Sequence, residues 1–243
     1  MLKQVQHDKQ LRVGHAGTLD PFATGLLIVG VGREATKRLD EFKAMPKTYI
    51  ATIKLGEVSD TYDRTGKISD YRPRTSDLRQ PTSSVLVPSP IRGGTEGGVC
   101  EKRNRLDKYP LPCPPPNRGR NDEIKQIKKV IKSFKGKQLQ IPPMFSAKKI
   151  NGKKLYELAR QGITVERKPN EIEIYKIKIL DYSWPLLKIE VRCSAGTYIR
   201  SLAHDIGQKL GTGAYCQNLT RTKIGKYDLS KASDINGLNI STL

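Results

Sequence analysis

The chain has few of the residues that build metal centres and disulfide frameworks. Its 243 residues include only four cysteines and three histidines. The cysteines, at positions 100, 113, 193 and 216, form no CxxC pair, and no histidine stands at a zinc-type spacing from them. We therefore expect reduced thiols, no bound metal and no metal-dependent chemistry.

Long apolar runs are also missing. The longest, LLIVGV at residues 26–31, contains a glycine and is far shorter than the roughly 20 residues that span a bilayer. The opening residues MLKQVQHDKQ lack the apolar segment of a signal peptide. We expect a cytoplasmic protein with no membrane partner.

Acidic residues are scarce relative to basic ones. Lysine and arginine number 44 against 24 aspartates and glutamates, which gives a net charge of +20. Such an excess predicts an anionic partner, and the phosphate backbone of a nucleic acid fits it well.

One central segment differs from the rest of the chain. Residues 71–120 hold nine of the 15 prolines and show no apolar periodicity. Because such a stretch buries too little apolar surface to offset its ordering entropy, we predict a flexible insertion there. Residues 1–70 and 121–243 would then form one discontinuous domain.

Strand patterns stand on both sides of this segment. Apolar residues alternate with polar ones in residues 49–55 and again in residues 187–193. Both stretches predict strands with one buried face. The alternation changes phase between Ile174 and Ile177, which predicts a bulge in a third strand.

Helical spacing occurs in two further stretches. Apolar residues recur every three or four positions in residues 124–134 and 198–210, and Gly136 and Gly211 stand where C-terminal caps would fall. Strands interspersed with helices in this way indicate an α+β domain.

The segment GHAGTLDPFATG, residues 14–25, contains the most informative acidic residue. Pro21 disfavours the α conformation at Asp20, and the glycines allow tight turns and a close approach of other backbone. An acid at such a corner projects outward. The same Asp-Pro pair is also typical of a helix start, with Asp20 as the N-cap.

Three more blocks follow in order: KTYIATIKLGEVSDTYDRTGKI (47–68), QIPPMFSAKKINGKKLYELARQG (140–162) and RCSAGTYIRSLAHDIG (192–207). Together with residues 14–25 they resemble the TruB-type tRNA pseudouridine synthases, in the bacterial stand-alone branch. Four blocks in one order are far more specific than one short motif. The resemblance implies a pseudouridine synthase fold, with a central mixed, mostly antiparallel sheet flanked by helices and loops.

The resemblance also implies an activity. The chain would isomerise uridine to pseudouridine in RNA, at the T-loop uridine of tRNA, as a monomer and without a cofactor. Asp20 matches the family's catalytic aspartate, Tyr49 its active-site tyrosine, and Arg160 is our candidate cation beside Asp20. An ionised carboxylate beside the ribose could attack C1′ or assist proton removal at C2′.

Further residues match the family's substrate-binding positions. His15 would contact the RNA, Tyr198, Ile199 and Arg200 would line the floor of the pocket, and nearby lysines would position phosphates. The complete set expected to bind the tRNA T-stem-loop is His15, Gly17, Thr18, Leu19, Lys148, Lys149, Tyr198, Ile199 and Arg200.

The sequence also departs from the family pattern. From the resemblance we expect that the family's N-terminal strand and its C-terminal PUA domain have no counterpart here, and the 71–120 segment is longer than usual. The alternative function is therefore a catalytically impaired RNA-binding remnant or a tRNA folding chaperone. The joint presence of Asp20, Tyr49 and Arg160 favours the enzyme.

Overall fold

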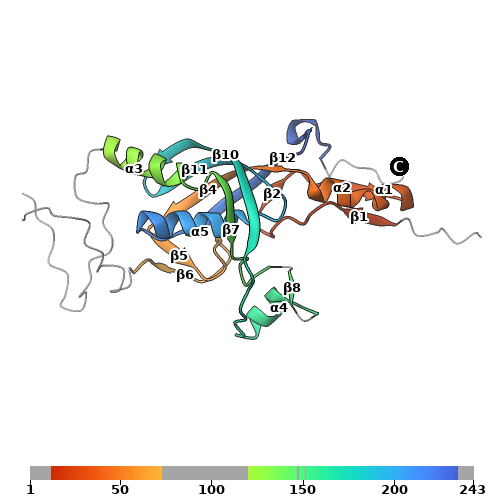
Figure 1. Cartoon of the computed structure of the whole chain (residues 1–243), viewed down its shortest axis with the longest axis horizontal. Helices are drawn as coiled ribbons and strands as arrows, with labels where there is room; N and C mark the ends of the chain where they lie inside the picture. The colour runs from red at the N-terminus through yellow and green to blue at the C-terminus, as the bar shows by residue number, and fades with distance from the viewer. Residues whose placement is uncertain (1–11, 73–119, 147, 151, 235–243) are drawn as a thin grey trace, which may run out of the picture.

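The computed structural model describes residues 12–72, 120–146, 148–150 and 152–234 (Figure 1). The elements in the first part are β1 (Val13–His15), β2 (Thr24–Gly25), β3 (Val29–Val31), α1 (Arg33–Lys37), α2 (Leu39–Ala44), β4 (Lys47–Leu55), β5 (Glu57–Ser59) and β6 (Ile68–Asp70). After residue 119 follow α3 (Arg120–Lys132), β7 (Gly136–Gln140), β8 (Lys149–Ile150), β9 (Lys153–Lys154), α4 (Leu155–Arg160), β10 (Asn170–Ser183), β11 (Leu186–Cys193), α5 (Ile199–Leu210), β12 (Ala214–Ile224), β13 (Tyr227–Asp228) and the 3-10 turn η2 (Leu229–Lys231).

A seven-stranded sheet forms the centre of the fold. Its strands follow the order β13-β12-β4-β11-β10-β7, and the short β2 pairs with β12 outside this path. Every pair on the path is antiparallel, whereas β2 runs parallel to β12. The expected mixed, mostly antiparallel sheet is confirmed.

The alternating segments form adjacent strands of this sheet. In β4, Ala51, Ile53 and Leu55 are buried, and β11 buries every second side chain opposite them. The predicted bulge is confirmed, because the register between β10 and β11 shifts between Ile174 and Lys176. Period-two patterning therefore predicted both the strands and the face that each one buries.

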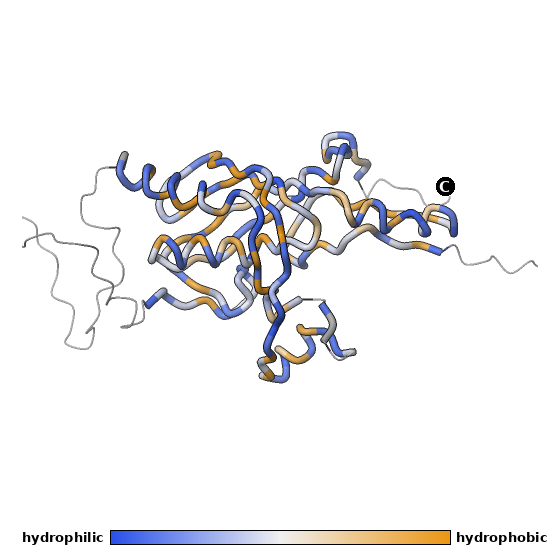
Figure 2. The backbone as a smooth tube through the Cα atoms, viewed as in Figure 1, coloured by the Kyte–Doolittle hydropathy of each residue, from blue (hydrophilic) through white to orange (hydrophobic). Residues whose placement is uncertain are grey.

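Two helices pack against the sheet. Helix α5 lies along β12 and β4, and α3 packs on α5 and β10 (Figure 1). The apolar residues of both helices join those of the strands in one core cluster, and in Figure 2 hydrophobic positions recur along α5 and the strands beside it. Gly211 ends α5 in the left-handed conformation, as predicted.

The second predicted cap is wrong. Helix α3 already ends at Lys132, and Gly136 instead opens strand β7 with φ +105°. A glycine that follows a helical pattern can cap the helix or stand later in the connection, because it tolerates a positive φ in either place.

Two groups of elements extend from the central sheet. The antiparallel pair β1–β3 with α1 and α2 extends at one end, and α4 with the paired strands β8 and β9 extends from another side (Figure 1). Residues 73–119 of the predicted insertion lie outside the described residues. None of the described helices is both long enough and apolar enough to cross a bilayer.

Candidate active site

Asp20 lies in a tight turn between β1 and β2. Its carbonyl oxygen accepts a hydrogen bond from the Ala23 amide at 2.9 Å, with Pro21 at the second position of the turn. No helix begins here, so the alternative of a helix cap is wrong. The Asp20 side chain keeps 29% of its accessible surface, which leaves the carboxylate open to a ligand.

Arg200, in the first turn of α5, binds this carboxylate. Its Nε donates to Asp20 Oδ2 and its Nη2 to Asp20 Oδ1, both at 2.8 Å. Such a bidentate pair fixes the orientation of the carboxylate. The prediction that Arg160 pairs with Asp20 is wrong: Arg160 is exposed on α4 and lies over the Tyr156 ring.

The remaining donors of Arg200 are also used. Nη1 donates to the Thr61 carbonyl oxygen at 3.0 Å and to Asp63 Oδ2 at 3.1 Å, and Nη2 also donates to the Phe145 carbonyl oxygen at 2.9 Å. All five N–H groups of a guanidinium therefore have partners. Because Arg200 is only 3% exposed, these bonds hold it in one position.

Asp63 is a site residue that our sequence reasoning missed. It is 3% exposed, and its Oδ1 accepts hydrogen bonds from the Thr61 hydroxyl and from the amide of Thr65, both at 2.8 Å. Its other oxygen faces Arg200. The only sequence signal was its place inside the 47–68 block, where an aspartate before Arg-Thr-Gly is equally typical of a turn.

Tyr49 lies on β4 and is half-buried. Burial raises its pKa, and the negative charge of nearby Asp20 adds to this rise. The positive charge of Arg221 lowers the pKa of Tyr49 again in part. The structure therefore brings Tyr49, Asp20 and Arg200 into one neighbourhood, as a neutral phenol beside an ion pair.

Other predicted residues lie around this group. Thr18 and Leu19 directly precede Asp20, and His15 is exposed on β1. Tyr198 is the N-cap of α5, and the Gln140 side chain binds its backbone on both sides, accepting from the Tyr198 amide at 2.8 Å and donating to its carbonyl oxygen at 3.0 Å.

The remaining predicted residues differ in their setting. Ile199 is buried in the core, so its side chain contributes packing beneath the site and not an exposed surface. Gly17 has φ +90° at the start of the Asp20 loop. Lys148 donates to Asn170 Oδ1 at 2.6 Å. Lys149 lies in β8, in the group of elements that α4 forms with β8 and β9.

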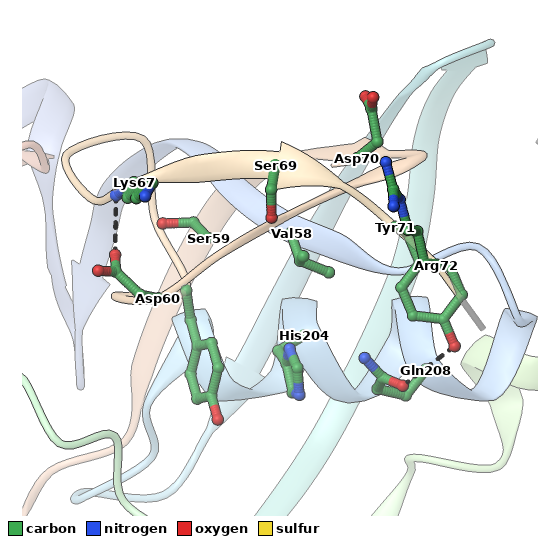
Figure 3. A pocket seen from close by; sticks show the side chains of 11 residues that line it. Val58, Ser59, Asp60, Lys67, Ser69, Asp70, Tyr71, Arg72, His204 and Gln208 are labelled. Atoms are coloured by element: carbon green, nitrogen blue, oxygen red, sulfur yellow. Dashed lines mark hydrogen bonds between the residues drawn. The ribbon is translucent and has the colours of Figure 1, made fainter. Parts of the chain in front are cut away.

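A cavity of about 1150 Å³ lies further along α5, on the C-terminal side of Arg200. His204 and Gln208, one and two turns beyond Arg200, line it together with the β5–β6 hairpin (Figure 3). The His204 ring stacks on Tyr62 with 4.1 Å between centroids. In the described ranges, no three His, Cys, Asp or Glu side chains are placed to hold a metal ion.

Two family models match the chain. The model described as "TruB family pseudouridylate synthase (N terminal domain)" matches residues 3–86 and 117–199. The model described as "tRNA pseudouridylate synthase B C-terminal domain" matches residues 200–240. The boundary between the two matches falls at Arg200, so the residues that meet around Asp20 come from both.

Curated relatives are similar along almost the whole chain. A tRNA pseudouridine synthase B of Protochlamydia amoebophila is 41% identical over 232 residues, which cover 96% of this chain and 70% of that protein. The protein of the same name from Clostridium acetobutylicum is 42% identical over 240 residues, 98% of this chain and 67% of its own length.

A solved structure shares the fold. A chain in the crystal structure of a Cbf5–Nop10–Gar1 complex matches with a TM-score of 0.52 at 24% identity. The match covers 89% of this chain and 41% of that one, so the present chain spans about two fifths of the solved protein.

Proposed function

Because the chain belongs to the TruB family of pseudouridine synthases, we propose that it isomerises uridine to pseudouridine in RNA. The observation that carries the proposal is the Asp20 carboxylate, which is partly exposed and held at both oxygens by the buried Arg200. A carboxylate held in one orientation and partly open to solvent is placed as chemistry at a ribose carbon requires.

The reaction rearranges bonds within one nucleotide. The bond between ribose C1′ and uracil N1 breaks, the uracil turns, and a bond between C1′ and C5 forms. C5 loses a proton and N1 gains one, so no electrons or groups are exchanged with another molecule. The chemistry therefore needs a positioned acid or base but no cofactor.

Three side chains have roles in this scheme. Asp20 acts at the ribose, either by attack on C1′ or by assisting proton removal at C2′. Arg200 holds the Asp20 carboxylate in place through both of its oxygens. The Tyr49 ring stacks on the base, since bases taken out of their helix are gripped by aromatic faces.

The substrate we propose is the T-loop uridine of tRNA. The names of the curated relatives and the net charge of +20 support a tRNA substrate. His15, Gly17, Thr18 and Leu19 precede Asp20 in the chain and would contact the RNA, and Lys148 and Lys149 would bind its phosphates. We further propose that the protein acts as a monomer in the cytoplasm.

An unmodified tRNA transcript tests this function. We expect the purified protein to form one pseudouridine per transcript, detected by chemical mapping of the modified base. A transcript with cytidine in place of the T-loop uridine is the matched control and should remain unmodified. A protein that binds the transcript tightly and yields no pseudouridine would instead be the RNA-binding remnant or chaperone.

A further inference from the structure

Arg221, on β12, is a buried cation beside the Asp20 loop. It is 2% exposed, and no carboxylate lies within ion-pair distance of it in the described part of the chain. Because a buried charge without an ion-pair partner is costly, stability alone would favour an apolar residue at this position.

The guanidinium of Arg221 binds both ends of the loop that carries Asp20. Nε donates to the Leu26 carbonyl oxygen at 2.7 Å, and Nη2 donates to the Gly17 carbonyl oxygen at 3.0 Å. The Leu26 amide in turn donates to the Arg221 carbonyl oxygen at 2.8 Å. One residue therefore fixes the points at which this loop begins and ends.

The neighbours of Arg221 belong to the same site. Arg221 is the register partner of Tyr49 in the pairing of β12 with β4. Gly25 pairs with Arg221 on the other side of β12, and a Cβ at Gly25 would stand 2.3 Å from the Arg221 carbonyl oxygen. Arg221 therefore binds the Asp20 loop and lies opposite Tyr49 in the sheet.

We propose that Arg221 is a positioning residue for the isomerisation, which sets the Asp20 carboxylate relative to Arg200 and to the Tyr49 ring. The inference rests on the proposed function and extends it to a residue that does not touch the substrate. The planar guanidinium presents its donors in a fixed fork, so it can bind two carbonyl oxygens at once in one geometry. A lysine ammonium would keep the charge but could not bind both carbonyl oxygens in this fixed geometry.

Single-turnover kinetics on an unmodified tRNA transcript test the inference. With enzyme in excess, we expect Arg221→Met to lower the rate constant by about 100-fold, since a small misplacement of a reacting group has an effect of that order. Arg221→Lys keeps the charge and should fall between wild type and Arg221→Met. The dissociation constant for the transcript should stay within about threefold, because a transition-state interaction is lost and not a binding one.

The matched control is Ile224→Ala, a truncation of a buried side chain on the same strand. It should lower the Tm while leaving the rate constant within about threefold of wild type. If Arg221→Met does not fold, Arg221→Lys decides the question, with an expected loss of about 10-fold.

Two results would contradict the account in different ways. A wild-type protein that forms no pseudouridine overturns the proposed function. An active wild type whose Arg221 variants lose no more rate than Ile224→Ala overturns the positioning role alone.

Discussion

At the scale of single residues, one guanidinium joins two carboxylates from distant parts of the chain. Arg200 binds Asp20 through two bonds and Asp63 through a third. Asp63 is buried and faces donors on both oxygens, whereas Asp20 keeps part of its surface free. The two acids therefore have different roles. Asp63 holds Arg200 in place, and Arg200 in turn orients the Asp20 carboxylate.

Asp63→Asn tests this division. The substitution turns an N–H₂ group or a neutral oxygen toward Arg200, so a buried charge pair is broken. We expect the free energy of unfolding to fall by about 3–5 kcal/mol, measured by denaturant titration. Asp122→Asn is the matched control, because it removes an exposed ion pair with Lys125 and should cost at most about 1 kcal/mol. Equal losses in the two variants would contradict the role of Asp63.

His204 predicts a pH dependence. Burial lowers its pKa below the ordinary value of 6.5. Between the folded pKa and 6.5 the unfolded chain binds more protons at this histidine, so the stability it contributes is lost as the pH falls through that window.

His204→Phe keeps an aromatic ring beside Tyr62 and removes the titration. Denaturant titrations at about pH 7.5 and about pH 5.5 should show a smaller loss of unfolding free energy in this variant than in wild type. The difference between the two proteins isolates His204 from other groups such as Asp205, whose pKa burial raises to about 6. Parallel pH dependences would contradict the expectation.

At the scale of elements, the site depends on where β12 meets the Asp20 loop. The short β2 pairs in parallel with β12 at Thr220 and Arg221, directly after the loop. Gly25 has φ +107° and lies so close to the Arg221 backbone that no side chain fits. This close approach is the packing that the glycines of the 14–25 segment predicted.

Gly25→Ala should disrupt this junction. The added Cβ meets backbone atoms at 2.3 Å and 2.8 Å, in addition to the strain of a positive φ. Gly32→Ala is the matched control, because Gly32 has φ +86° with nothing within 4 Å of the added atom. We expect Gly32→Ala to cost about 1–2 kcal/mol of strain and Gly25→Ala clearly more, in thermal unfolding. Equal Tm shifts would contradict the close packing.

Local patterns predicted the elements better than the contacts between them. The strands β4 and β11, the bulge after Ile174 and the cap at Gly211 follow from periodicity and backbone conformation, which are local properties. The partner of Asp20 stands 180 positions away, and nothing local distinguishes Arg200 from Arg160. The resemblance supplied the acid, but the sheet and α5 had to be assembled before the cation could be identified.

At the scale of the whole molecule, positive charge is in large excess. The full chain carries 44 lysines and arginines against 24 aspartates and glutamates, so ion pairs cannot neutralise all of its cations. The surplus leaves many cations available to phosphates. Binding of RNA should therefore be dominated by a salt-dependent term that is insensitive to sequence.

Filter binding of a tRNA transcript at increasing salt tests this term. We expect the affinity to fall by roughly two orders of magnitude between about 50 mM and about 200 mM monovalent salt, as counterions are released. Asp20→Asn should show the same slope, because the carboxylate is not a phosphate contact. An affinity that is independent of salt would contradict the electrostatic account.

The central claim is that the Asp20 carboxylate, which Arg200 holds in place, carries out the isomerisation of uridine. The most direct measurement compares pseudouridine formation by wild type and Asp20→Asn in a single turnover, with transcript binding measured in parallel. We expect Asp20→Asn to bind the transcript with nearly wild-type affinity and to form no pseudouridine. An Asp20→Asn variant that converts the T-loop uridine at the wild-type rate would contradict it.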